Sequence, residues 1–151
     1  MATARQQLYC VMNESHPLAK KSSVRLRDCA DQPAVLPHCD SGIRQLLDAG
    51  LLYRNVQLNL VIETNSHEFL KTYLNREKVI SFQIPIAMKR GLINAPNGID
   101  AIVARPVDMA DVPPGIMHIG QLKGRVLSVA AAKFLDDIIN ELSLEYGEGL
   151  N

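Results

Sequence analysis

The chain has 151 residues, of which 47% are hydrophobic and 21% charged, a composition typical of one soluble globular domain. Sixteen Lys and Arg residues balance sixteen Asp and Glu residues, which argues against a protein that coats nucleic acid or an anionic membrane through excess positive charge. No apolar run approaches the roughly 20 residues that span a bilayer. Residues 1–7 also lack the apolar core of a secretory signal, so we expect a cytoplasmic protein with no membrane partner.

Cysteine and histidine positions give no sign of a metal centre or a disulfide framework. Cys10, Cys29 and Cys39 are odd in number, and their spacing fits no common zinc pattern. Because a reducing cytoplasm keeps thiols free, we expect free cysteines. The histidines are scattered, without a pair four residues apart beside an acidic partner. We therefore expect no metal and no cofactor.

The N-terminal third alternates short apolar runs with turn-forming residues. Residues 8–12 form an apolar run that predicts a buried strand. Residues 16–23 are predicted to form a loop, because Pro17 lacks the N–H that a sheet requires. A helical turn is expected at 24–31 and a second strand at 34–36.

Two helices with small polar residues at their starts follow. Asp40-Ser41-Gly42 opens the first, whose apolar residues recur at helical spacing. Residues 56–62 alternate between apolar and polar side chains, which predicts a strand. Thr64-Asn65-Ser66 precedes the second helix, where the charge of Glu68 favours the helix start. The elements expected after it are a strand at 79–84, a short helix at 87–92, a turn at 94–98, strands at 99–107 and 116–122, and a last helix that begins at 127–129.

Strands that alternate with helices at these loop lengths predict an α/β fold with a mixed, mostly parallel sheet and flanking helices. Ligands bind such sheets at strand-to-helix turns, where free N–H groups attract carboxylates and phosphates. The turns at 40–42 and 64–66 have the small polar residues that suit this role. The same residues also cap helices in proteins that bind no ligand, so both interpretations stay open.

His38-Cys39-Asp40 raises a catalytic alternative, a thiol near a helix start beside a possible base. Adjacent residues in an extended segment point to opposite sides, however, and the sequence identifies no other partner. We therefore expect a free thiol at Cys39 and no catalytic residues.

Several segments, in one register over nearly the whole chain, together resemble the effector domain of LysR-type transcriptional regulators. Their order and spacing are more specific than any one of them. The segments are 16–19 with 24–28 (HPLA and VRLRD), 41–47 (SGIRQLL), 63–66 (ETNS), 79–84 (VISFQI) and 127–135 (LSVAAAKFL).

The resemblance implies a periplasmic-binding-protein-like fold of two α/β subdomains joined by crossover strands, with a small effector in the cleft. It assigns residues 1–24 to a partial first subdomain and crossover strand, 25–120 to a complete second subdomain, and 121–151 to the return crossover and the C-terminal helix of the first. The helix-turn-helix DNA-binding region, the linker helix and the first half of the effector domain are expected to be absent, so this chain is expected to make no direct DNA contact.

The family's cleft positions fall on Asn13, Ser41, Gly42, Asn65, Ser66 and Ser81. The resemblance therefore implies that these residues bind a small effector, and the free N–H groups at the helix starts favour an anionic one. Asn13 is equally well explained as a turn former at a strand end. The family often has a glycine-rich turn before the strand at 79–84, whereas this chain has Asn75-Arg76-Glu77-Lys78. Close approach of a ligand to the backbone is less favoured there.

Two other functions remain open on the sequence alone. One is a small stand-alone α/β enzyme that acts on an anionic metabolite through Ser41 or Cys39. The other is a truncated remnant without independent activity. In that case an unpaired sheet edge favours self-association, which we expect of this chain.

Overall fold

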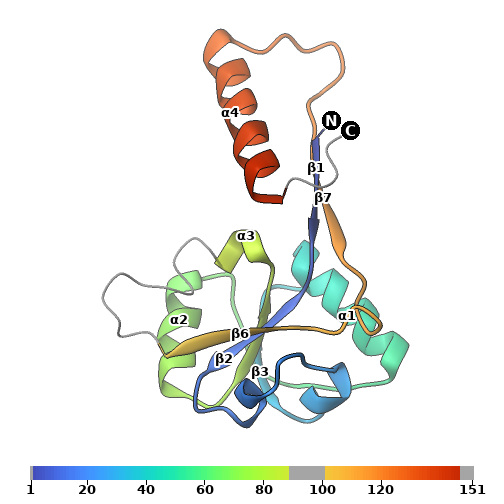
Figure 1. Ribbon diagram of the computed structural model, residues 1–151, viewed down its shortest axis with the longest axis vertical. Coiled ribbons are helices and arrows are strands. Elements are labelled where there is room, and N and C mark those ends of the chain that lie inside the picture. Colours follow the sequence, from blue (N-terminus) through green and yellow to red (C-terminus); the bar gives the residue numbers. More distant parts are fainter. Residues whose placement is uncertain (1, 89–100, 147–151) are drawn as a thin grey trace. The chain divides into compact units, whose positions relative to one another are not determined.

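The computed structural model describes residues 2–88 and 101–146, which divide into two compact units (Figure 1). The larger unit spans 7–114, and the smaller one combines residues 1–6 with 115–151. The resemblance predicts subdomain boundaries at 24/25 and 120/121. By their contacts, residues 7–24 belong to the larger compact unit, because a strand within them pairs inside its sheet.

The described part of the larger unit contains a five-stranded sheet in the order β4-β3-β5-β2-β6. Its strands are β2 (Tyr9–Asn13), β3 (Pro33–Leu36), β4 (Asn59–Glu63), β5 (Ile80–Gln83) and β6 (Ile102–Pro106). β3 pairs parallel with β4 and β5, whereas β2 pairs antiparallel with β5 and β6. The mixed α/β architecture is thus confirmed, but parallel pairs are not the majority, since β2 and β6 carry the chain into and out of the unit in opposite directions.

Two helices cover opposite faces of this sheet. α1 (Gly42–Arg54) follows β3, and its buried Leu47 packs with Cys10 and Phe82 on one face. α2 (His67–Arg76) follows β4, and its Leu70 and Leu74 pack with apolar residues of β2 and β3 on the other. Because successive side chains of a strand point to opposite faces, each central strand contributes to both cores.

Short helical segments complete the larger unit. The predicted loop at 16–23 contains the 3₁₀ helix η1 (Pro17–Lys20), because the buried His16 accepts the Leu18 N–H at Nδ1, 3.1 Å away. The predicted turn at 24–31 contains the 3₁₀ helix η2 (Leu26–Cys29). α3 (Pro85–Met88) starts earlier than predicted, and the rest of the helix expected at 87–92 and the turn at 94–98 lie outside the described residues.

The described part of the smaller unit consists of a two-stranded sheet and one helix. β1 (Ala2–Gln6) pairs antiparallel with β7 (Gly115–Ile119). α4 (Val129–Tyr146) lies against β1 and begins where the last helix was predicted. Within α4 only Leu142 is buried, so most of the helix surface is at least partly exposed to solvent. No helix in the described residues is long and apolar enough to cross a membrane.

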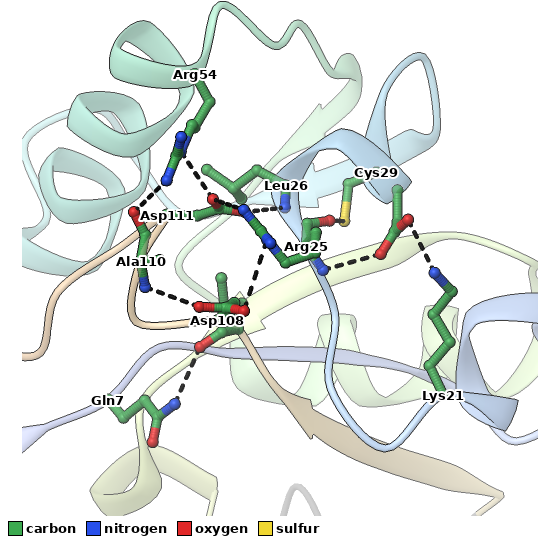
Figure 2. A network of polar contacts seen from close by, with 11 residues as sticks. Gln7, Lys21, Arg25, Leu26, Cys29, Arg54, Asp108, Ala110 and Asp111 are labelled. Atoms are coloured by element: carbon green, nitrogen blue, oxygen red, sulfur yellow. Dashed lines mark hydrogen bonds and ion pairs between the residues drawn. The ribbon is translucent and has the colours of Figure 1, made fainter.

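A buried carboxylate connects distant parts of the larger unit (Figure 2). The side chain of Asp111, 2% exposed, accepts two hydrogen bonds from the Arg25 guanidinium, at 3.0 and 2.9 Å. It also accepts the Leu26 N–H at 2.9 Å and lies 2.8 Å from Nε of Arg54, near the end of α1. The hydrogen bonds from Arg25 and Leu26 favour the ionised form and hold the pKa of Asp111 below its ordinary value.

The same loop also packs closely on α1. A Cβ atom added at Gly50 would lie 2.6 Å from Cγ2 of the buried Val112 and 3.1 Å from the Asp111 carbonyl oxygen. Glycine is therefore required at this position for the helix to approach the loop. The ion pairs at Arg54 and the close contact at Gly50 together fix the C-terminal half of α1.

We predict that Asp111→Asn lowers the free energy of unfolding at neutral pH by about 2 kcal/mol, because charged hydrogen bonds are lost inside the protein. In the wild type the unfolded state takes up the proton first. The contribution of the Asp111 carboxyl to the free energy of unfolding is therefore full above about pH 5 and falls as the pH drops below about 4. Urea titrations followed by circular dichroism between pH 7 and 3 measure both effects.

Asp40→Asn is the matched control, since the Asp40 side chain is 82% exposed and should affect stability little. Equal stability and equal acid sensitivity of wild type and Asp111→Asn would contradict the assignment.

Candidate functional site

A cavity of about 240 Å³ lies where β3 and β4 end and α1 and α2 begin. Because β3 and β4 are parallel, their carboxyl ends meet at one edge of the sheet, where open α/β sheets bind ligands. The whole cavity lies in the larger unit. Its lining residues are Pro37, Ser41, Ile43, Thr64, Asn65, Ser66, His67, Leu70 and Gln83.

Both helices present serine-capped amino ends to this cavity. Ser41 caps α1, with Oγ accepting the Arg44 N–H at 3.1 Å, and Ser66 caps α2, with Oγ accepting the Phe69 N–H at 3.2 Å. Each cap takes one N–H group of the first turn, whereas a helix start has four without an intrahelical partner. The remaining groups and the two helix dipoles favour an anion here.

Asn65 connects the two loops that form the cavity wall. Its Oδ1 accepts the His38 N–H at 2.9 Å, which joins the loop after β4 to the loop after β3. Its Nδ2 has no hydrogen-bond partner among the described residues. The amide group is therefore held in place by one atom and free to donate with the other.

A guanidinium stabilises the wall from outside the cavity. Arg44, whose side chain is 14% exposed, donates to the Pro37 carbonyl at 3.1 Å and to Glu63 at 3.0 Å, and its Nε donates to Asp48 at 3.0 Å. Its charge is thus balanced by two carboxylates. The lining itself contains no Lys, Arg, Asp or Glu, so hydrogen bonds and helix dipoles supply its polarity.

Gln83 is a lining residue that the sequence reasoning missed. It ends β5, is 4% exposed, and its Oε1 is buried without a hydrogen-bond partner. The alternation of side chains along β5 could have indicated it, because Ser81 and Gln83 occupy the same face of the strand. Only Ser81 was predicted to bind the effector.

The structure brings together Ser41, Asn65 and Ser66 of the predicted binding residues, and places the other three elsewhere. Asn13 donates from Nδ2 to the carbonyls of Leu74 and Asn75, each at 3.2 Å, so it lies at the opposite end of α2. Gly42 begins α1 and is exposed, but it does not line the cavity. Ser81 is buried with an unpartnered Oγ and does not line it either.

The two nucleophile candidates from the sequence, Cys39 and Ser41, have no base hydrogen-bonded to them among the described residues. Cys39 is exposed, and neither Cys39 nor Ser41 makes a side-chain hydrogen bond with a histidine, lysine or carboxylate. Across the described ranges, no group of three His, Cys, Asp or Glu side chains could hold a metal ion.

Comparison with known proteins gives one family and one fold. The family model for the LysR substrate binding domain matches residues 2–143. The regulatory domain of Synechocystis PCC6803 CcmR in complex with 2-PG is similar with a TM-score of 0.72 and 20% identity, over 94% of this chain and 65% of that one. The effector binding domain of QuiR in complex with shikimate is similar with a TM-score of 0.74 and 20% identity, over 97% of this chain and 66% of that one.

HinK, a LysR family transcriptional regulator from Pseudomonas aeruginosa, gives a TM-score of 0.70 and 18% identity, over 92% of this chain and 45% of that one. This chain therefore spans less than two thirds of the length of each of these three. No curated protein sequence matches it.

We predict that Ser66→Ala lowers the free energy of unfolding by about 1 kcal/mol, because the cap of α2 is lost. Ser66→Asp should retain most of the stability, since a carboxylate caps well and suits the helix dipole. Thermal and urea unfolding of the three proteins measures the difference. If Ser66→Ala were as stable as the wild type, the Oγ–Phe69 hydrogen bond would have no capping role.

Proposed function

Because the chain belongs to the LysR substrate-binding domain family, we propose that it is the effector-sensing part of a LysR-type bacterial transcriptional regulator. In this proposal the effector binds in the cavity at the starts of α1 and α2. The observation that supports this most is the cavity lining, in which two helix starts, the free Asn65 amide and the Gln83 carboxamide converge. Concave sites with a few convergent polar groups are typical of small-molecule binding. The complexes of CcmR with 2-PG and QuiR with shikimate are consistent with it.

The proposed effector is anionic. First-turn N–H groups and the Asn65 amide donate hydrogen bonds, and no acidic side chain lines the cavity to repel a negative charge. The effector acts by population shift, favouring the arrangement of the regulator that it binds more tightly. In this proposal the larger unit is the second effector subdomain and the smaller unit is part of the first. The chain works in the cytoplasm, catalyses no reaction and makes no direct DNA contact.

The test is an NMR titration of the ¹⁵N-labelled chain with a broad metabolite panel of carboxylates, phosphates, amines, sugars and nucleosides. We expect anionic compounds to shift the first-turn amides of α1 and α2. Ser66→Asp should abolish these shifts, because it keeps the cap but adds a repelling charge. Ser128→Asp, the same change near the start of α4, is the control and should bind normally. The proposal fails if no compound of any class shifts the cavity amides.

We further propose that the chain self-associates through the smaller unit. In its described part the β1–β7 ribbon pairs with no further strand, which leaves open edges. α4 also exposes large apolar side chains, with Phe134 66% and Leu144 82% exposed. Exposed apolar surface of this kind favours association.

Light scattering after size exclusion should give a mass above the monomer value of 16.7 kDa. Phe134→Glu should shift the chain towards monomer, because it places a charge on the open face of α4. Leu52→Glu is the control, since Leu52 is 85% exposed but lies in the larger unit. A monodisperse wild-type monomer would contradict self-association.

A further inference from the structure

We infer that Gln83 determines which ligands the cavity accepts, and that the preferred class is small acids with a hydroxyl group that pairs with the Gln83 carboxamide. This inference rests on the proposed function, because it concerns the ligand of the same cavity. Gln83 carries it through three properties: burial, the lack of a partner and its place in the lining.

Other polar side chains of the lining have a local structural role that Gln83 lacks. Oxygen atoms of these side chains accept backbone N–H groups, which stabilises the two loops and helix starts. The pairs are Ser41 with Arg44, Thr64 with Ser66, Asn65 with His38, and Ser66 with Phe69. Gln83 makes no hydrogen bond of this kind to any described residue.

The fold therefore gains nothing from the polarity of Gln83. The Gln83 Oε1 atom is buried without a partner, which is unfavourable, and an apolar side chain of similar size is tolerated at least as well. Leu70 of α2, also nearly buried, lines the same cavity and gives an apolar residue something to pack against. A costly polar group that faces a cavity is explained if a ligand satisfies it.

The carboxamide restricts the chemistry of that ligand. It has one donor and one acceptor end, and the two ends can exchange places by rotation of the amide. A hydroxyl group donates and accepts, so it pairs with the carboxamide in either orientation. A methylene group forms no hydrogen bond with the carboxamide in either orientation. A ligand with a methylene group at this place would bury the amide without a hydrogen-bond partner. With an acid group at the helix starts, the ligand is then a hydroxylated small acid.

The test compares acids that differ by one hydroxyl group. The pairs are lactate and propionate, malate and succinate, and 3-hydroxybenzoate and benzoate, each titrated by NMR into the full chain. In at least one pair we expect the hydroxylated acid to bind about tenfold more tightly than its partner. Gln83→Leu should bring the two affinities close together, while its melting temperature without ligand stays the same or rises.

Gln45→Leu is the matched control, because Gln45 is an exposed residue of α1 outside the lining and should leave the preference intact. The inference is overturned if no pair favours the hydroxylated acid, or if the preference survives in Gln83→Leu. Its failure is distinguishable from that of the proposed function. If the ligand that binds has no hydroxyl group, and its binding is abolished by Ser66→Asp, only the inference is contradicted. If nothing binds in the cavity, both the inference and the proposed function are contradicted.

Discussion

The position of α1 depends on the buried carboxylate of Asp111. This side chain accepts hydrogen bonds from Arg25, 86 residues away in sequence, and contacts Arg54 near the end of the helix. At the other end, Arg44 joins the first turn of α1 to the Pro37 carbonyl and to Glu63. The helix is thus anchored at both ends by guanidinium groups. Its amino end can therefore present fixed N–H groups to the cavity without help from a ligand.

The described lining of the cavity contains no Lys, Arg, Asp or Glu side chain, so the proposed preference for anions would depend on other groups. Arg44 stabilises the cavity wall, but Glu63 and Asp48 balance its charge. What remains is the partial positive charge of two helix starts, which is short-ranged and directional. Recognition then depends on where hydrogen-bonding groups lie, and less on total charge. A site of this kind distinguishes ligands by shape and by the placement of their polar atoms.

The sequence could predict features that depend on neighbouring residues, such as the helix starts at Ser41 and Ser66. Ser41 and Ser66 lie at helix starts because serine caps are a local signal, and both line the cavity. Gln83 was missed because alternation shows which face a strand residue occupies but not how far along the strand the cavity reaches. Asn13 could not be placed, since its partners at Leu74 and Asn75 lie 61 and 62 residues away.

The unit boundaries and strand directions were harder still, because they depend on pairing between distant segments. The pairing of β2 with β5 and β6 joins residues 7–24 to the larger unit and makes two of the four strand pairs in its described sheet antiparallel. The Arg25–Asp111 pair likewise joins segments that no local pattern connects. Hydrophobic periodicity identifies elements, whereas tertiary contacts decide their neighbours.

The hydrogen bond from the His38 N–H to Asn65 Oδ1 joins the loop after β3 to the loop after β4. An amide that donates from its nitrogen becomes a stronger acceptor at its oxygen, because hydrogen bonds in a chain polarise one another. A ligand that accepted a hydrogen bond from Asn65 Nδ2 would therefore also strengthen the hydrogen bond from the His38 N–H to Oδ1. Binding of such a ligand would make the loops after β3 and β4 more rigid relative to each other.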